Sequence, residues 1–274
     1  PLKVYQSVSV YRYETKATRP LLRMREFLFN EAHTAHKDWN DAERQIKEAI
    51  EVYETVFKRL GLFYLILKRP DFDKFPGAVY SVAFDAWNPD GRVNQIGTVH
   101  NLGENFAKAF EITFEDADGN QKNAMQTCYG VGISRVLAAV IAQHGDDRGI
   151  ILPPEIAPIQ VVIVPIPYKK LESKIEAYAR EVYERIKAAG FQVHLDEQNK
   201  TPGEKYYHWE LLGIPVRAEV GPRDLKERGV TLSERFSQER TYVQFDEIVP
   251  AIKRLFSTIM TDLETRSHST LKDM

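Results

Sequence analysis

Two charged side chains near the start of the chain, Arg12 and Glu14, have the types and the spacing to hold one ligand together. Residues two apart on a strand face the same side of it. A guanidinium is a planar fork for phosphate oxygens, and a carboxylate accepts a hydrogen bond from an exocyclic amine of a base. The alternative is a solvated hairpin whose charges pair across its strands, and composition alone favours that alternative.

A second polar group lies in a strand-like stretch and comprises Gln95, Thr98, His100 and Asn101. Gly97 and Gly103 permit close approach by a ligand or another chain segment. A bulged edge strand with ordinary turn residues explains the same spacing, so both interpretations stay open.

A glycine-rich turn, Gly130 to Arg135, follows a strand pattern and precedes an apolar helix pattern. Arginine stands where a dinucleotide-binding fingerprint would have its third glycine, and no strand–helix–strand unit surrounds it, so that fingerprint is excluded. The helix dipole disfavours a cation in the first turn. We therefore expect an anionic partner near Arg135.

Glu31, His33 and His36 follow the charged hairpin closely. The two histidines have no second pair that would complete a metal site. A structural or site-lining role is favoured over a zinc site, and no metal ligands are expected from Cys or His.

The hydrophobic patterns predict the elements that position these residues. Alternation predicts a β-hairpin over residues 4–29 with a polar loop at its tip, and helical spacing predicts an amphipathic helix from Trp39 to Leu60. Strands are expected at 62–67, 78–86, 107–114 and 124–129, and a buried helix at 134–143.

The proline-rich segment Leu152–Pro158 marks a domain boundary, because such dense prolines can continue neither a helix nor a central strand. Strands and helices alternate beyond it, at 159–164, 171–189, 191–195, 204–212 and 216–220, followed by short strands near Val230 and Val243 and a final helix capped by Asp246. We predict an α+β fold: an antiparallel sheet with flanking helices, followed by an α/β domain with right-handed crossovers.

Composition excludes several classes of protein. The 274 residues suffice for two domains with their own cores, and 28% charged residues without low-complexity tracts argue against disorder. The longest apolar runs are too short to cross a bilayer, so no membrane is expected. A lone Cys128 excludes an internal disulfide framework and fits a reducing compartment, and a net charge of −2 excludes a globally basic nucleic-acid binder.

Read together, these segments resemble a class II aminoacyl-tRNA synthetase, and in particular a prolyl-tRNA synthetase of the archaeal/eukaryotic-like form. The likeness covers nearly the whole chain, and its motifs are long and ordered. The matching segments are Arg12–Glu14, Leu22–Phe27 and Glu31–His36 (motif 2), Lys74–Ala78, Pro89–Arg92, Gln95–Lys108, Cys128–Arg135 (motif 3), His144–Gly149, Leu152–Pro158, Trp209–Glu210 and Gly221–Asp224.

The resemblance implies a fold and a reaction: an antiparallel class II synthetase catalytic sheet, then an α/β anticodon-binding domain, with proline and ATP giving prolyl-adenylate and then prolyl-tRNA. By position, Arg12 would hold the α-phosphate, Glu14 the adenine amino group, and Gln95 the nucleotide. Arg23 and Arg135 would clamp the terminal phosphates together with Mg²⁺. Arg12 and Arg135 would be the catalytic pair, and the proline pocket would be lined by Phe29, Thr98 and His100.

In the second domain, the resemblance makes four residues candidates for anticodon contacts: Lys205, Glu210, Arg217 and Arg223. It implies domains at 1–152 (partial catalytic), 153–250 (anticodon-binding) and 251–274 (start of a C-terminal extension), in a cytoplasmic protein that is a homodimer at full length and whose partners are proline and tRNA(Pro).

Motif 1 and the Thr/Glu pair that grips the proline amine would precede Pro1, and a zinc-type domain would follow Met274. We therefore expect a chain truncated at both ends and weak or inactive alone. The alternative is a catalytically incomplete synthetase-like tRNA-binding or accessory module. Such modules commonly lose phosphate-binding arginines, whereas this chain keeps all of them, which favours the enzyme.

Overall fold

A computed structural model of the chain describes residues 1–269, and contacts within it separate two compact units. The first unit comprises residues 1–58 and 62–143, and the second comprises residues 59–61 together with residues from 144 onward. The division expected from the sequence, at 152/153 and 250/251, stays a prediction. Its last segment extends into residues 270–274, which lie outside the described residues.

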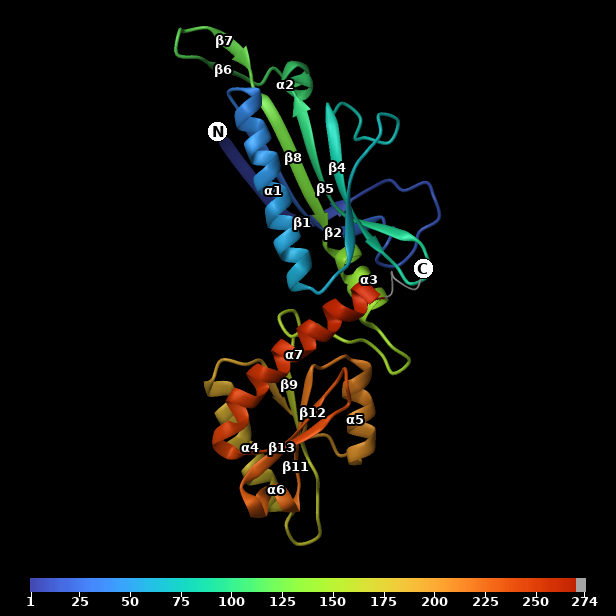
Figure 1. The fold of residues 1–274 in the computed structure, drawn as a ribbon, viewed down its shortest axis with the longest axis vertical. Helices are drawn as coiled ribbons and strands as arrows, with labels where there is room; N and C mark the ends of the chain where they lie inside the picture. The colour runs from blue at the N-terminus through green and yellow to red at the C-terminus, as the bar shows by residue number, and fades with distance from the viewer. Residues whose placement is uncertain (270–274) are drawn as a thin grey trace. The chain divides into compact units, whose positions relative to one another are not determined.

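The first unit is built on a six-stranded sheet whose neighbouring strands are all antiparallel, in the order β1-β2-β8-β5-β4-β3 (Figure 1). The strands are β1 (Leu2–Tyr11), β2 (Glu26–His36), β3 (Tyr64–Lys68), β4 (Tyr80–Trp87), β5 (Val93–Gly103) and β8 (Met125–Gly132). The predicted hairpin is confirmed, because β1 pairs with β2 and residues 12–25 form its tip. The glycine-containing strand β5 is central rather than at an edge, with β8 and β4 on its two sides.

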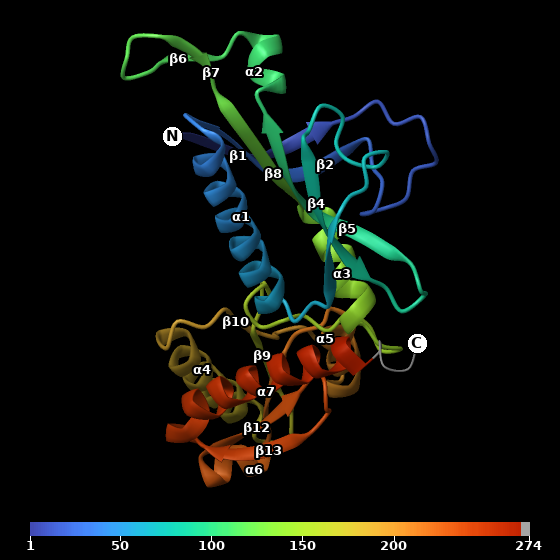
Figure 2. The ribbon, with the colours of Figure 1, turned by 45° about the horizontal axis from the view of Figure 1, so that its top comes forward.

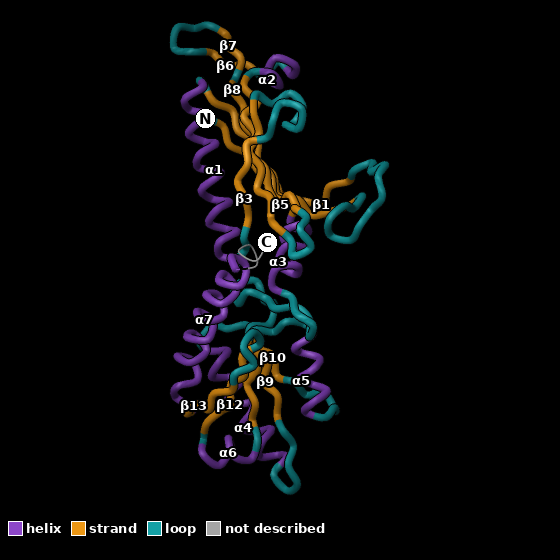
Figure 3. The backbone as a smooth tube through the Cα atoms, turned by 45° about the vertical axis from the view of Figure 1, so that its right-hand side comes forward, coloured by secondary structure: helices purple, strands orange, loops and turns teal. Residues whose placement is uncertain are grey.

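Helix α1 (Trp39–Arg59) covers one face of this sheet (Figure 3). Its apolar positions recur at helical spacing, so one face of the helix is buried. Tyr53 and Phe57 pack edge-on against Phe84 of β4, with ring centroids 5.8 and 5.4 Å from that of Phe84. This packing uses one side of the sheet and leaves the side chains of the other side free to line a site.

The prediction of a strand over residues 107–114 is wrong. Residues 105–110 form helix α2 (Asn105–Phe110), and only then does the chain enter β6 (Thr113–Glu115), which pairs with β7 (Gln121–Asn123). Phe106 and Phe110, four residues apart, stack on one face of α2 with centroids 6.3 Å apart. The helix lets these two rings pack on each other, although the composition of the segment also suits a strand.

Helix α3 (Ile133–His144) follows β8 directly, as the pattern predicted. Its first turn therefore begins at the end of a strand that lies in the middle of the sheet. The end of this strand and the start of this helix bring Gly130 to Arg135 next to β2 and β5.

The second unit has a five-stranded mixed sheet in the order β10-β9-β11-β12-β13 (Figure 2). Pairs among β10, β9 and β11 are parallel, and pairs among β11, β12 and β13 are antiparallel. Its strands are β9 (Val161–Pro165), β10 (Val193–Leu195), β11 (Val216–Val220), β12 (Gly229–Glu234) and β13 (Arg240–Gln244), and its helices are α4 (Glu172–Ala188), α5 (Pro202–Leu211), α6 (Pro222–Glu227) and α7 (Ile248–Ser269).

Both faces of this sheet are buried, which explains why β9 reads as a continuous apolar run. Val161 and Ile163 belong to a large core with α4 and α7, whereas Val162 and Val164 pack with Trp209 of α5 on the other face. The expected α+β order, an antiparallel unit followed by an α/β unit, is confirmed. Asp246 lies in a short 3-10 turn (Phe245–Glu247) rather than at the cap of α7, so that detail of the prediction is wrong.

Candidate functional site

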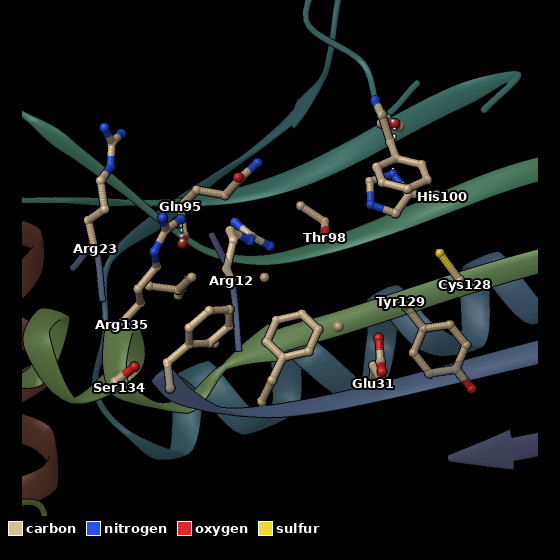
Figure 4. A pocket seen from close by; sticks show the side chains of 18 of the residues that line it. Arg12, Arg23, Glu31, Gln95, Thr98, His100, Cys128, Tyr129, Ser134 and Arg135 are labelled. Atoms are coloured by element: carbon tan, nitrogen blue, oxygen red, sulfur yellow. Dashed lines mark hydrogen bonds between the residues drawn. The ribbon is translucent and has the colours of Figure 1, made fainter. Parts of the chain in front are cut away.

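The first unit contains a pocket of about 450 Å³, lined by β2, β5 and β8, by the hairpin tip, and by residues 69–81 (Figure 4). Every residue expected in a nucleotide or amino-acid site of this unit lines it: Arg12, Glu14, Arg23, Phe29, Gln95, Thr98, His100 and Arg135. Tertiary structure thus brings together side chains that are spread over more than a hundred positions of the chain.

Arg135 is the residue that joins the separate segments. From the first turn of α3, its Nε donates to the carbonyl oxygen of Leu22 at 2.9 Å and its Nη1 to the carbonyl oxygen of Gln95 at 3.2 Å. Burial lowers the pKa of the guanidinium, and the positive charges of Arg12 and Arg23 add to this effect. An anion in the pocket would offset the repulsion among these three guanidinium groups. This agrees with the anionic partner expected near Arg135.

Arg12 and Glu14 lie at the base of the hairpin tip. The main-chain N–H of Arg12 donates to Arg25, and its guanidinium lies 5.3 Å from the ring centroid of Phe27. A hydrogen bond from the main-chain N–H of Lys16 lowers the pKa of Glu14, and nearby Arg23 acts in the same direction. Glu14 therefore stays ionised as a hydrogen-bond acceptor, and Nε of Arg23 lies 4.0 Å from its carboxylate.

The other end of the pocket is lined by aromatic rings. Thr98 and His100 lie on the pocket side of β5, while Val99 between them is fully buried, as the alternation of a strand requires (Figure 4). The ring of Phe75 lies against His100, with centroids 4.9 Å apart. Phe29 also lines the pocket, and it fits only because residue 130 is glycine: a Cβ there would lie 2.5 Å from Cζ of Phe29.

Several lining residues carried no role in the sequence argument. Arg69, Phe75 and Ser81 come from the segment before and within β4, and Phe27 and Cys128 from β2 and β8. The Lys74–Ala78 part of the family resemblance pointed at this segment without assigning it a role. Burial, with a contribution from Glu31, raises the pKa of Cys128 to about 12, so Cys128 is a neutral thiol and no nucleophile at neutral pH.

The histidine pair of β2 does not converge on a metal. Glu31 and His33 line the pocket, as the site-lining interpretation expected. His36 is buried elsewhere, with Nδ1 2.9 Å from the carboxylate of Asp41. Among residues 1–269 there is no group of three or more His, Cys, Asp or Glu side chains that could hold a metal ion. None of the helices in that range combines the length and the hydrophobicity that a membrane span requires.

The candidates in the second unit separate into two places. Glu210 on α5 and Arg217 on β11 form an ion pair of 3.1 Å, and the Arg217 guanidinium lies 3.9 Å from the ring centroid of Tyr206. Arg223 is exposed on α6, beyond the other end of β11, and pairs with Glu227. Lys205 is buried, with Nζ 3.0 Å from the carbonyl oxygen of Asp196, a position that disfavours direct contact with RNA.

Comparisons with known proteins agree with this architecture. Residues 1–144 match the tRNA synthetase class II core domain (G, H, P, S and T), and residues 160–255 match the anticodon binding domain. The chain is 54% identical over 272 residues to the proline–tRNA ligase of Pyrococcus abyssi, covering 99% of this chain and 56% of that protein. It is 49% identical to the proline–tRNA ligase of Methanocaldococcus jannaschii, covering 97% of this chain and 58% of that protein.

Among solved structures, the prolyl-tRNA synthetase of Cryptosporidium parvum complexed with L-proline and AMP superimposes with a TM-score of 0.94 at 35% identity, over 100% of this chain and 59% of that one. Another structure of that enzyme, with halofuginone and AMPPNP, gives the same TM-score over 57% of its length. The chain thus spans a little more than half the length of the relatives it matches. It belongs to the class II tRNA synthetase family, and within that family it is similar to the proline–tRNA ligases.

Proposed function

We propose that the protein carrying this chain activates proline with ATP and transfers it to tRNA(Pro), and that this chain supplies the nucleotide-binding part. The single observation that carries the proposal is one pocket with a cationic end and an aromatic end. The cationic end suits the phosphates of a nucleoside triphosphate, and the aromatic end suits the side chain of a small apolar amino acid. The relatives' names and the neighbour solved with L-proline and AMP support the same assignment.

The cationic end suits phosphoryl chemistry. In adenylation, a carboxylate oxygen of proline attacks the α-phosphorus, the bond to the bridging oxygen of the β-phosphate breaks, and pyrophosphate leaves. Arg12 is proposed to donate to the α-phosphate oxygens, on which negative charge grows in the transition state. Arg23 and Arg135 are proposed to bind the terminal phosphates, Glu14 the adenine amino group, and Gln95 the nucleotide.

The step needs no protein nucleophile, so a Ser–His–Asp set is not required. In the second step, a terminal hydroxyl of tRNA attacks the carbonyl carbon of prolyl-adenylate and AMP leaves. Because adenylation has no covalent enzyme intermediate, its rate depends on positioning and charge stabilisation.

Phe29, Thr98 and His100 are proposed to line the proline end, where a neutral His100 avoids repelling the substrate amine.

Mg²⁺ fits this site only as a companion of the nucleotide. The described residues offer no three-carboxylate or histidine cluster. Mg²⁺ usually keeps several waters and binds mainly through substrate phosphates. Such an ion would neutralise phosphate charge, and no residue of the described chain is assigned to it.

For the second unit, we propose that Glu210 and Arg217 contact the anticodon of tRNA(Pro), with Arg223 at a separate contact. Glu210 accepts and Arg217 donates hydrogen bonds, which suits base edges and phosphates respectively. A homodimeric state and a cytoplasmic location follow from the family resemblance and belong to the same proposal.

Pyrophosphate exchange tests the proposal on the full-length protein that carries this chain. We expect ATP–pyrophosphate exchange that depends on proline and is absent with threonine or histidine. Exchange with either of those amino acids and none with proline would overturn the substrate assignment. An Arg12→Ala protein serves as the inactive reference, because it lacks the proposed α-phosphate contact.

A further inference from the structure

The hydroxyl of Ser81 lies between two groups that line the pocket. The main-chain N–H of Phe75 donates to Oγ of Ser81 at 3.0 Å, and Oγ lies 2.7 Å from Nδ1 of His100. Ser81 is 1% exposed, so bulk water does not compete for its hydroxyl. The hydroxyl therefore has one donor and one ring nitrogen as its neighbours.

Counting protons decides which way this hydrogen bond runs. A serine hydroxyl has one proton and two lone pairs. Phe75 already occupies one lone pair, and Nδ1 of His100 is the one acceptor that the described residues offer to the proton. If Nδ1 carried the hydrogen, the buried hydroxyl proton would be left without an acceptor, which is unfavourable because the hydroxyl loses its hydration without a replacement. Each of these groups has a hydrogen-bond partner only when the Ser81 hydroxyl donates to Nδ1 of His100.

That arrangement sets the tautomer of the imidazole, because the bond made by one ring nitrogen determines the state of the other. With Nδ1 accepting, the hydrogen lies on Nε2. Among residues 1–269 Nε2 has no hydrogen-bond partner, and His100 lines the pocket. Burial lowers the pKa of His100 to about 4, so the ring is neutral at neutral pH.

Phe75 keeps the ring in place from the other side. Its ring lies against His100 at 4.9 Å, and it stacks on Phe106 of α2 at 6.0 Å with an interplanar angle of 18°. The same Ser81 hydroxyl that contacts Nδ1 thus also holds the main chain of the residue that packs on the imidazole. One buried hydroxyl fixes both the ring and the wall beside it.

We propose that Ser81 is a positioning residue that holds His100 as a neutral imidazole with Nε2–H directed at the ligand, and that this N–H donates to an acceptor group of the bound aminoacyl moiety. The identity of the ligand rests on the proposed function. The tautomer of His100 does not, and it is measured on the free chain.

Nitrogen NMR of the ¹⁵N-labelled chain tests the tautomer directly. In a long-range ¹H–¹⁵N spectrum at neutral pH, Nδ1 of His100 should resonate as a nitrogen without hydrogen and Nε2 as an N–H nitrogen. The His100 signals are those lost in His100→Gln among the seven histidines. A wild-type spectrum with the hydrogen on Nδ1 overturns the proposal, and this measurement needs no Ser81 variant to fold.

Two substitutions of Ser81 then separate positioning from packing. In Ser81→Ala the two nitrogen signals should move toward each other, because the tautomers mix once the hydroxyl is gone. Ser81→Thr keeps a hydroxyl and should retain the wild-type pattern. An unchanged His100 spectrum in a folded Ser81→Ala chain would contradict the role of the hydroxyl.

Ligand binding tests the consequence for the pocket. The probes are a non-hydrolysable sulfamoyl analogue of prolyl-adenylate and AMPPNP, titrated calorimetrically into the full-length protein that carries this chain. Ser81→Ala should weaken the analogue about five- to tenfold, as expected for one hydrogen bond, and should leave AMPPNP unchanged. Equal weakening of both probes would make Ser81 a general support of the fold and contradict the proposal.

The same titrations distinguish the two proposals. A wild-type full-length protein that has the expected tautomer and binds AMPPNP but not the prolyl analogue would contradict the proposed function. A chain that binds both probes with the hydrogen on Nδ1 would contradict the inference about Ser81 alone.

Discussion

The Nε of Arg135 donates to the carbonyl oxygen of Leu22 at 2.9 Å, across 113 positions of the sequence. This bond connects the first turn of α3 to the hairpin tip that carries Glu14 and Arg23. The guanidinium therefore contributes positive charge to the pocket and also holds the loop that carries Glu14 and Arg23. Replacing Arg135 should remove that charge and loosen that loop.

Arg135→Ala should weaken AMPPNP binding to the chain about tenfold or more, because a charged hydrogen bond to phosphate contributes about 1.5–3 kcal/mol. Arg135→Lys should recover only part of that loss, since an ammonium cannot donate to two carbonyls in the geometry of a planar fork. Isothermal titration measures both. Arg44→Ala, an exposed arginine on α1, is the matched control and should bind normally. Undiminished affinity in Arg135→Ala would refute the phosphate assignment.

Gly130→Ala should displace Phe29, because the new Cβ would lie 2.5 Å from Cζ and 2.7 Å from Cε1 of that ring. We expect a loss of about 1–3 kcal/mol in the free energy of unfolding, measured with urea. Gly132→Ala is the control on the same strand, since its nearest contact would be 3.6 Å away. The double variant Gly130→Ala with Phe29→Leu should recover stability. Equal behaviour of the two glycine variants would show that Phe29 is not confined by residue 130.

Stability should depend on pH through His144 of the second unit. Burial lowers its pKa from 6.5 to about 4, and its Nε2 donates to the carbonyl oxygen of Leu60 at 2.8 Å. Between pH 4 and 6.5 the unfolded chain binds a proton that the folded chain does not, so stability falls as the pH falls. The slope from this residue is at most about 1.4 kcal/mol per pH unit. Urea unfolding of His144→Gln should give a flatter profile in that window, and a slope identical to wild type would contradict the assignment.

Replacing Arg235 should lower the free energy of unfolding more than replacing an exposed arginine that also pairs with a carboxylate. Its guanidinium is almost fully buried and donates to both carboxylate oxygens of Asp146, at 2.9 and 2.6 Å. Arg235→Ala leaves the partly exposed carboxylate of Asp146 without its partner and should cost about 1.5–3 kcal/mol. Arg180→Ala removes an exposed pair with Glu197 and should cost clearly less. Urea denaturation compares the two, and similar losses would contradict the difference in burial as the cause.

Arg217→Ala should weaken binding of a tRNA(Pro) transcript, measured by fluorescence anisotropy over a range of salt concentrations. If its guanidinium contacts a phosphate, the salt slope should fall by about 1, whereas a base contact should lose about 1–3 kcal/mol of discrimination against an altered anticodon. Arg180→Ala, an exposed arginine of α4 that pairs with Glu197, is the control. Binding that is unaffected at every salt concentration would remove Arg217 from the proposed interface.

The sequence alone predicted the elements with strong local patterns. The helical period from Trp39 to Leu60 and the alternation on both sides of residues 12–25 each repeat over many residues, so local preference and burial agree. The strand prediction over residues 107–114 failed at its start, because a short stretch with few apolar residues suits either a helix or a strand. Phe106 stacks on Phe75, about thirty positions earlier, and no local pattern records that contact.

The charged residues of the site were also visible in the sequence, because Arg12, Glu14, Arg23 and Arg135 are types that bind phosphates and bases. Only the tertiary structure decided how they are used. The antiparallel order β2-β8-β5 places them around one pocket. It also adds Ser81 and Phe75, which have no distinctive chemistry by themselves, and it buries Lys205. The physical reason is that residue type and spacing specify which bonds a side chain can make, whereas burial and partners depend on segments that meet only after the chain has folded.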